Sequence, residues 1–250
     1  MGTHRSIKRA KSHSKARIPG KAFAFSKKSI LKAAKGLKQA MKGGGFIGID
    51  PDLHATGIAF VGLEGAYKVR VARAPDTFRG HHASCKMVNQ ILTEVALLRQ
   101  GIPEGTPLTC VVELPEIYSN HRARSTHVNP QDIVNLAIVS GGALAGLQCF
   151  MMGGVVLGVQ AKSWTGGIDK GVRQLKMLQV LNWQGEPRYE GKVSKITGER
   201  CPGYWVPNKC DVAGLDGADA LKNKDWKHVL DAICLAAWGM QKAYEGMLLT

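Results

Sequence analysis

The stretch Phe46-Ile47-Gly48-Ile49-Asp50-Pro51 decides how the rest of this 250-residue chain is interpreted. It is a short apolar run that ends in an aspartate, and a second apolar run, Thr56-Gly57-Ile58-Ala59-Phe60-Val61, follows after a turn. Two such runs around a turn predict a β-hairpin with Asp50 at the end of its first strand. Because burying an unpaired carboxylate is costly, an aspartate in that place usually serves a cation, a phosphate or a proton.

By itself this pattern is compatible with more than one function. Sugar kinases and actin-like ATPases also begin with a Gly-Ile-Asp strand and a Thr-Gly turn, and their site binds nucleotide phosphates. A simpler alternative is that Asp50 only caps the turn that follows it. Other polar residues further along the chain are needed to decide between these possibilities.

Positive charge is concentrated at the N-terminus. The chain has 34 Lys and Arg against 19 Asp and Glu, a net charge of +15, and residues 1–45 contain 13 of the basic residues and no acidic one. Such an arm is typical of nucleic-acid binding. We expect residues 1–27 to be disordered and Lys28–Lys42 to form a basic amphipathic helix, followed by a hinge at Gly43-Gly44-Gly45.

The cellular setting is predicted from the same arm and from the cysteines. The six cysteines are scattered rather than spaced as a disulfide framework, which favours a reducing, intracellular environment. We expect a cytoplasmic protein, in the host cytoplasm if the source is viral. An organelle transit peptide is also basic and free of acids, so a mitochondrial location is the alternative.

No membrane association is expected, although Leu136–Val159 carries no charged residue. Glycine pairs interrupt this stretch, and a buried helix followed by a buried strand explains it better than a membrane span. A zinc site at Cys201 and Cys210 is not favoured, because no second pair of ligands with zinc spacing accompanies them.

From Phe46 onward the hydrophobic pattern alternates strands and helices. Three strands close enough for an antiparallel meander are predicted at 46–50, 57–64 and 67–74, and two more at 108–113 and 154–160. Helices are predicted at 83–99, 130–147, 170–183 and 225–246, and residues 184–223 are typical of an insertion or long loop. This order predicts an α/β domain over 46–250, with a mixed five-stranded sheet flanked by helices.

Three acidic residues and one histidine occupy places where they can meet. Asp50 and Glu113 end two strands, and His228 and Asp231 share one face of the last helix because they are three residues apart. Hard oxygen ligands suit Mg²⁺ or Mn²⁺. Two such ions about 4 Å apart can activate a water and stabilise the leaving oxygen in phosphodiester cleavage. Alternatively, Glu113 is a turn residue and the helix pair is solvated.

The ordered motifs resemble the RuvC family of Holliday-junction resolvases, which have the ribonuclease H fold. The motifs are Gly-Ile-Asp-Pro with Thr-Gly, Val-Val-Glu113, Val-Gln-Ala-Lys162-Ser-Trp-Thr-Gly166 with Asp169-Lys170 and Gln174, and His228-x-x-Asp231-Ala. The segment from Glu113 through Asn129-Pro-Gln-Asp-Ile to Gly141 is more similar to the bacteriophage members. The resemblance covers residues 46–180 and 225–240.

The resemblance implies site residues one position at a time. Its metal ligands match Asp50, Glu113 and Asp231, and His228 stands where family members carry Asp or His. Lys162 and Lys170 match basic positions near the scissile phosphate, where they would hold the phosphate and offset transition-state charge. Each of the two is otherwise an ordinary exposed lysine.

One feature of the family is altered in this chain. Some bacterial relatives place an aromatic residue three positions after the glutamate to wedge into the junction, and here that position is Glu116. Tyr118 is a candidate substitute, or it packs within its loop. The loop that follows contains Arg122 and Arg124 and suits a surface that tracks phosphates.

The sequence therefore predicts a Mg²⁺- or Mn²⁺-dependent, structure-selective endonuclease with two ions that resolves branched DNA, four-way junctions first. Family members act as homodimers, and the helix 131–147, with its small residues, is a candidate dimer face. The alternatives are an inactive DNA-binding protein on the same fold and an actin-like phosphotransferase. The latter needs a second glycine-rich phosphate turn, which the sequence does not offer.

Overall fold

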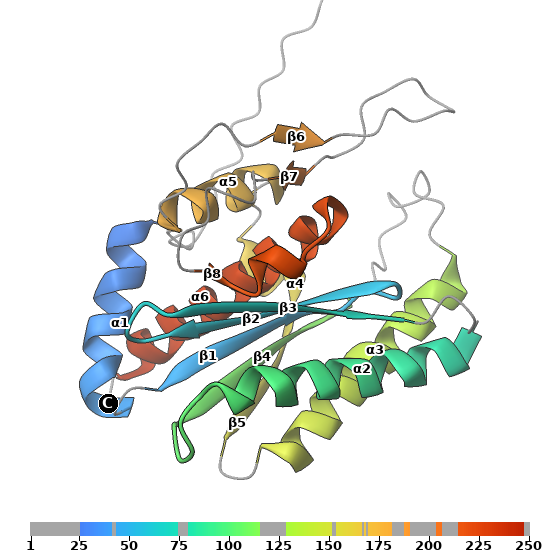
Figure 1. Cartoon of the computed structure of the whole chain (residues 1–250), viewed down its shortest axis with the longest axis horizontal. Coiled ribbons are helices and arrows are strands. Elements are labelled where there is room, and N and C mark those ends of the chain that lie inside the picture. The colour runs from blue at the N-terminus through green and yellow to red at the C-terminus, as the bar shows by residue number, and fades with distance from the viewer. Residues whose placement is uncertain are drawn as a thin grey trace, which may run out of the picture.

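The centre of the molecule is a six-stranded β-sheet with the strand order β5-β4-β1-β2-β3-β8 (Figure 1). The computed structural model describes residues 26–41, 44–74, 80–115, 129–151, 154–166, 168, 170–181, 188–190, 204–206 and 215–247. The strands of the sheet are β1 (Gly45–Asp50), β2 (Ala55–Gly62), β3 (Tyr67–Arg73), β4 (Leu108–Leu114), β5 (Val155–Gln160) and β8 (Leu215–Asp216). The first three form an antiparallel meander, β4 runs parallel to β1, and β5 runs parallel to β4.

This topology confirms the predicted α/β, ribonuclease H-like mixed sheet. The number of strands needs correction, because the two-residue strand β8 pairs with β3 and makes a sixth. β8 lies inside residues 184–223, which we expected to be an insertion or loop, as does a separate hairpin of β6 (Arg188–Glu190) and β7 (Tyr204–Val206). Strands this short carry no hydrophobic periodicity from which they could be predicted.

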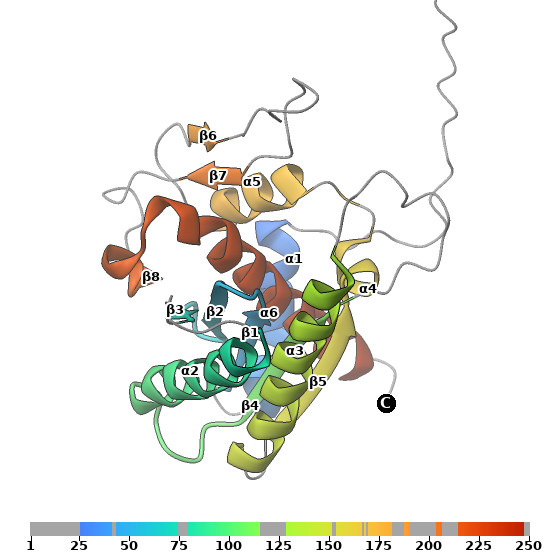
Figure 2. The same ribbon diagram turned by 90° about the vertical axis from the view of Figure 1, so that its right-hand side faces the viewer.

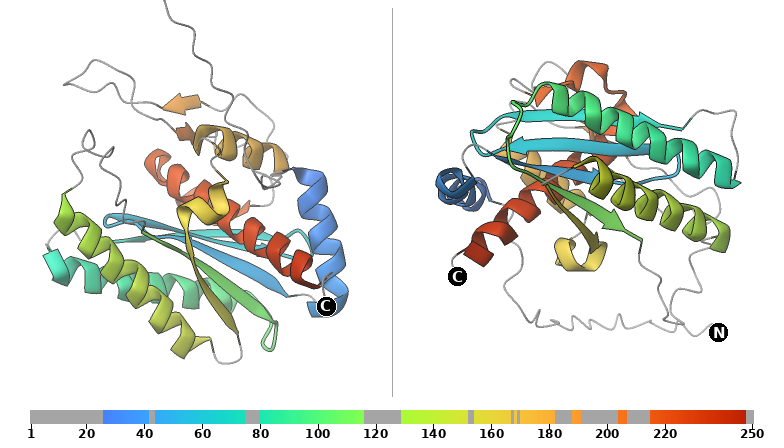
Figure 3. Two further views of the ribbon diagram at one scale, coloured as in Figure 1. Left: turned by 180° about the vertical axis from the view of Figure 1, so that it is seen from behind. Right: turned by 90° about the horizontal axis from the view of Figure 1, so that it is seen from below.

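Helices cover both faces of the sheet (Figures 2 and 3). One face is covered by α2 (Gly80–Gln100) and α3 (Pro130–Phe150), and the other by α6 (Trp226–Met247), against which α1 (Lys27–Met41) and α5 (Lys170–Val180) pack. A short helix, α4 (Ala161–Thr165), follows β5, and the 3-10 turns Ala218–Ala220 and Asn223–Asp225 lead into α6. The sheet is therefore the middle layer of three.

The two faces are set by the alternation of side chains along the strands. In β1, Ile47 and Ile49 lie in the hydrophobic core beneath α2 and α3, whereas Phe46 lies in the core shared with α6. Asp50 is four residues after Phe46, so its side chain lies on the same face of the sheet and faces α6. Its side chain is nevertheless largely buried, with the residue 9% exposed.

Glycines allow α6 to lie directly on the sheet. A Cβ atom added to Gly48 would be 2.0 Å from the carbonyl oxygen of Ala232, and one added to Gly57 would be 2.3 Å from the carbonyl oxygen of His228. Neither distance is compatible with a side chain, so the helix backbone occupies the space that side chains of β1 and β2 would fill. This close approach brings the N-terminal half of α6 over Asp50.

Helix α1 is part of the folded domain. Its apolar face is buried through Ile30, Ala33 and Leu37, and Gly36 lies against the ring of Tyr244 on α6. The helix predicted over Lys28–Lys42 is thus present, and the arm predicted for residues 1–45 does not extend through it as a disordered segment. Residues 1–25 and 42–43 lie outside the described residues.

The uncharged stretch that imitates a membrane span is divided between α3 and β5. In the described part of the chain, α3 is one helix long and apolar enough to cross a membrane, with 28% of its most apolar window buried. Two of its glycines face α2, with Gly142 against Val88 and Gly146 against Leu92, whereas a Cβ atom on Gly141 would meet nothing within 4 Å among the described atoms. Gly142 and Gly146 therefore serve the contact with α2, and the dimer face predicted on residues 131–147 stays a prediction.

Candidate active site

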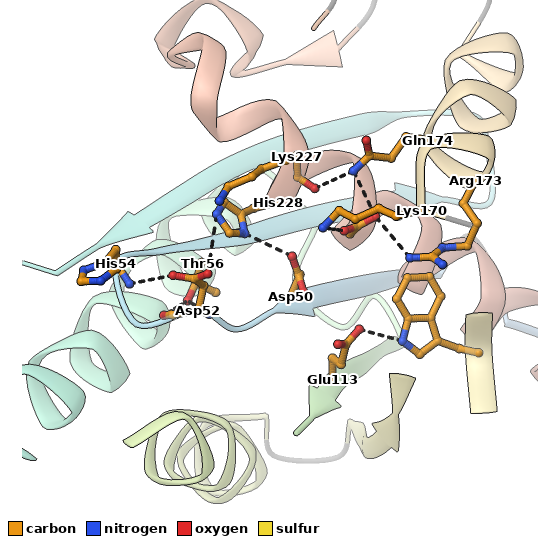
Figure 4. Close-up of polar contacts among 12 residues, drawn as sticks. Asp50, Asp52, His54, Thr56, Glu113, Lys170, Arg173, Gln174, Lys227 and His228 are labelled. Carbon is orange, nitrogen blue, oxygen red and sulfur yellow. Dashed lines mark hydrogen bonds and ion pairs between the residues drawn. The ribbon is translucent and has the colours of Figure 1, made fainter. Parts of the chain in front are cut away.

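Asp50 and Glu113 lie side by side at the ends of neighbouring strands. The parallel register pairs Ile49 of β1 with Val112 of β4, so the next residue on each strand is one of the two carboxylates. Side chains at the same level of adjacent strands point to the same face. Both carboxylates therefore face α6, as Figure 4 shows.

Helix α6 adds His228 and Asp231 to this face, and both are nearly inaccessible to solvent at 6% and 3% exposure. Nδ1 of His228 lies 3.3 Å from Oδ2 of Asp50, and its Nε2 lies 3.9 Å from Oδ2 of Asp52. The imidazole thus stands between two carboxylates, one on each ring nitrogen. It fixes the orientation of Asp50 from above the sheet.

Asp231 is held by three residues of α5. Lys170, the first residue of that helix, forms an ion pair with Asp231, and Nη2 of Arg173 lies 3.8 Å from its Oδ1. Nε2 of Gln174 donates to the same Oδ1 at 3.3 Å and to the backbone carbonyl of Lys227 at 3.0 Å. These contacts anchor α5 to α6 and leave Asp231 with little freedom to rotate.

Glu113 is held from the other side by α4. Nε1 of Trp164 donates a hydrogen bond to Oε2 of Glu113 at 2.8 Å. The guanidinium of Arg173 lies over the Trp164 ring, 4.8 Å from its centroid. Trp164 is 1% exposed, so this hydrogen bond is shielded from water.

The site has more negative charge than its lysine neutralises. Burial and the nearby charge of Asp50 raise the pKa of Glu113 from 4.5 to about 8, against the hydrogen bond from Trp164. Burial likewise raises the pKa of Asp231, although Lys170 opposes it. Burial alone would lower the pKa of Lys170, but Asp231 and Asp50 hold it above its ordinary value. Burial is thus the main cause of the raised pKa values of the two carboxyls, and the negative charge of the carboxylates is the cause for Lys170.

The surplus of negative charge at the site is what a divalent cation would neutralise. As the side chains stand, no group of three or more His, Cys, Asp or Glu residues among the described residues is close enough together to hold a metal ion. The donor set nevertheless fits Mg²⁺ or Mn²⁺, since it offers three carboxylates and an imidazole. Lys170 and Arg173 are the positively charged side chains beside Asp231.

The fold of this chain has counterparts among solved structures. A structure of Thermus thermophilus RuvC in complex with a Holliday junction substrate is similar with a TM-score of 0.45 and 17% sequence identity, over 82% of this chain and 96% of that chain. A second Thermus thermophilus RuvC structure has a TM-score of 0.45 and 18% identity, over 81% of this chain and 96% of that chain. No protein-family model and no curated protein matches the sequence.

The predicted site residues divide into three groups. Asp50, Glu113, His228 and Asp231 come together as described, and Lys170 joins them through Asp231. Lys162 is exposed on α4. Tyr118, Arg122 and Arg124 lie outside the described residues.

Sequence reasoning missed four polar residues that shape the site: Asp52, Trp164, Arg173 and Gln174. Trp164 and Gln174 stood within the motif that suggested the family, but their side chains were given no role. Their burial, with Gln174 fully inaccessible, is the signal that the sequence lacked. A pocket of about 510 Å³ lined by Phe60, Lys68 and Ile102 lies at the other end of the sheet, away from this chemistry.

Proposed function

We propose that the protein is a divalent-metal-dependent endonuclease that cleaves branched DNA, with four-way junctions as its first substrate. The observation that carries the proposal is the convergence of Asp50, Glu113 and Asp231, from two strands and a helix, in one buried and negatively charged site. Burial and neighbouring carboxylates raise the pKa of Glu113 to about 8, and burial raises the pKa of Asp231, as expected where acidic groups are gathered in a site of low polarity.

Each residue has a proposed role. Asp50, Glu113 and Asp231, with His228, would hold Mg²⁺ or Mn²⁺, which when bound activates a water and stabilises the leaving oxygen. His228 keeps the Asp50 carboxylate oriented, and Arg173 and Gln174 do the same for Asp231. Lys170 carries a positive charge at the edge of the cluster, where it would offset charge that develops on the phosphate.

Branched DNA as the substrate class follows from the RuvC-like motifs of the sequence. A basic stripe on α1 supports contact with a nucleic acid: Lys28, Lys32 and Lys35 are all exposed on the outer side of this docked helix. Like charges at such spacing repel one another in a helix, and a phosphate backbone relieves that repulsion. The stripe would add affinity without reading sequence.

A homodimer is part of the proposal, because paired cuts in a four-way junction suit a two-fold assembly. Large apolar side chains are exposed on α3 and β5, namely Val134, Phe150, Val155 and Leu157. β5 is also an edge strand of the sheet. Sedimentation of the purified protein tests this assembly, and Leu157→Glu is expected to yield monomers.

The deciding experiment uses a fluorescently labelled four-way junction and a linear duplex of the same strands, with Mg²⁺, Mn²⁺ or a chelator. We expect cleavage of the junction that needs the metal and is abolished by Asp50→Asn, while binding of the junction persists. Binding without cleavage under any divalent metal would instead favour the inactive DNA-binding protein. Tight binding of ATP without junction cleavage would favour the phosphotransferase.

A further inference from the structure

Trp164 contacts the candidate site through a single polar atom. Its indole N–H, which can donate but not accept, points at Oε2 of Glu113 from 2.8 Å. This hydrogen bond restrains the rotation of the Glu113 carboxylate and engages its Oε2.

The indole ring is itself held in place by Arg173. The guanidinium stacks 4.8 Å from the ring centroid, and its Nη1 donates to the backbone carbonyl of Ile168 at 2.6 Å. Arg173 is 7% exposed and also reaches Oδ1 of Asp231 at 3.8 Å. A continuous chain of contacts therefore joins Glu113, Trp164, Arg173 and Asp231, which lie on β4, α4, α5 and α6.

We propose that Trp164, supported by Arg173, is a positioning residue that orients the Glu113 carboxylate to receive a divalent cation. The inference rests on the proposed function, since it assumes that Glu113 is a metal ligand. A ligand whose orientation is fixed beforehand binds a metal more tightly than one that must be ordered on binding. The same hydrogen bond favours the ionised carboxylate, the form that ligates, against the effect of burial.

The chain offers a matched control for this role. Trp226 is also fully buried and lies at the start of α6, but its indole N–H has no hydrogen-bond partner in the described part of the chain. Trp164→Phe and Trp226→Phe remove the same atoms from equally buried sites. Only Trp164→Phe removes a hydrogen bond to a carboxylate. A loss of Mn²⁺ affinity that both variants share therefore comes from lost packing, and an extra loss in Trp164→Phe comes from lost positioning.

The test measures binding of Mn²⁺ alone to the full chain, by calorimetry and by the rise in melting temperature with added Mn²⁺. We expect Trp164→Phe to weaken Mn²⁺ binding about 10- to 100-fold, the range found for residues that orient metal ligands. Trp226→Phe should change it less than about 3-fold. Junction cleavage by Trp164→Phe should recover most of its rate at saturating Mn²⁺.

A second variant, Arg173→Lys, tests the same role in case Trp164→Phe does not fold. Arg173→Lys keeps a positive charge near Asp231 but cannot stack as a planar group. We expect it to weaken Mn²⁺ binding in the same direction as Trp164→Phe, by a smaller factor. The inference is overturned if the wild type binds Mn²⁺ and cuts junctions while Trp164→Phe and Trp226→Phe behave alike. If the wild type neither binds Mn²⁺ nor cuts junctions, the proposed function itself is wrong, and the role of Trp164 falls with it.

Discussion

His228 and Asp50 are 178 residues apart in the chain, yet Nδ1 of the imidazole lies 3.3 Å from Oδ2 of the carboxylate. The contact joins the last helix of the domain to its first strand. His228 is therefore placed to determine how the Asp50 carboxylate is oriented.

The first prediction concerns this contact. His228→Ala should lower junction cleavage about 100-fold, because Asp50 loses the group that orients it. In His228→Asn, the side-chain amide can donate from near the place of Nδ1, so cleavage should stay within about 10-fold of wild type. Single-turnover rates measure both, and equal losses in the two variants would show that orientation of Asp50 is not the role of His228.

The second prediction concerns the glycines beneath α6. Gly48→Ala would place a Cβ 2.0 Å from the carbonyl oxygen of Ala232, so α6 must move. We expect the free energy of unfolding to fall by about 1–3 kcal/mol. Cleavage should be lost, because His228 and Asp231 move with the helix.

Gly141→Ala is the control for this change. Gly141 lies in α3, and an added Cβ would meet nothing within 4 Å among the described atoms. Since alanine is the better helix former, the variant should be as stable as wild type or up to about 1 kcal/mol more stable. Urea denaturation measures both variants, and a destabilised Gly141→Ala would undermine the comparison.

The third prediction follows from the pKa of Glu113, which rises from 4.5 to about 8 on folding. Between these values the folded protein keeps a proton that the unfolded chain releases. Without metal, the free energy of unfolding should therefore decrease as the pH rises through this window, by up to about 1.4 kcal/mol per pH unit. Glu113→Gln should make that decrease smaller, because its side chain is neutral throughout, while Asp231, whose pKa is also raised, still contributes.

Urea denaturation in a chelator at several pH values from about 5 to about 9 tests this slope. Added Mn²⁺ should reverse the trend, since cation binding favours the ionised carboxylates and its strength should increase with pH. An identical slope for wild type and Glu113→Gln would mean that another group causes it.

The fourth prediction concerns the basic stripe on α1. Replacing Lys28, Lys32 and Lys35 together by Gln should weaken binding of four-way and linear DNA alike. The slope of log affinity against log salt should become shallower by up to about 3, since each lost phosphate contact removes about 0.9. Lys86→Gln, an exposed lysine on α2, should leave the slope unchanged. Fluorescence anisotropy over a salt series measures all of these.

The strands β1 to β5 and the helices α2, α3 and α6 could be predicted because each has a local pattern, a period of two or a helical stripe, set by one buried face. Asp50 and Glu113 were recognisable because a carboxylate at the end of an apolar strand is unusual. β8 and α4 were not predicted, since they are too short to show a period.

The roles of the supporting residues of the site could not be predicted from the sequence either. That Trp164 donates to Glu113, and that Arg173 stacks on it, depends on how α4 and α5 fold back over the sheet. Trp164 and Glu113 are 51 positions apart, and a local pattern cannot reveal a contact at that separation. The same holds for α1, whose lysines suggested a free arm while Ile30 and Leu37 pack it against α6.

The place of α6 after β1 and β4 in the chain also determines when the proposed ligands can come together. β1 and β4 are made early during synthesis, but they carry only two of the four proposed ligands. His228 and Asp231 reach them only when α6, the last helix described, has left the ribosome and settled on Gly48 and Gly57. A partly synthesised chain that lacks α6 therefore holds only Asp50 and Glu113 of the four proposed ligands.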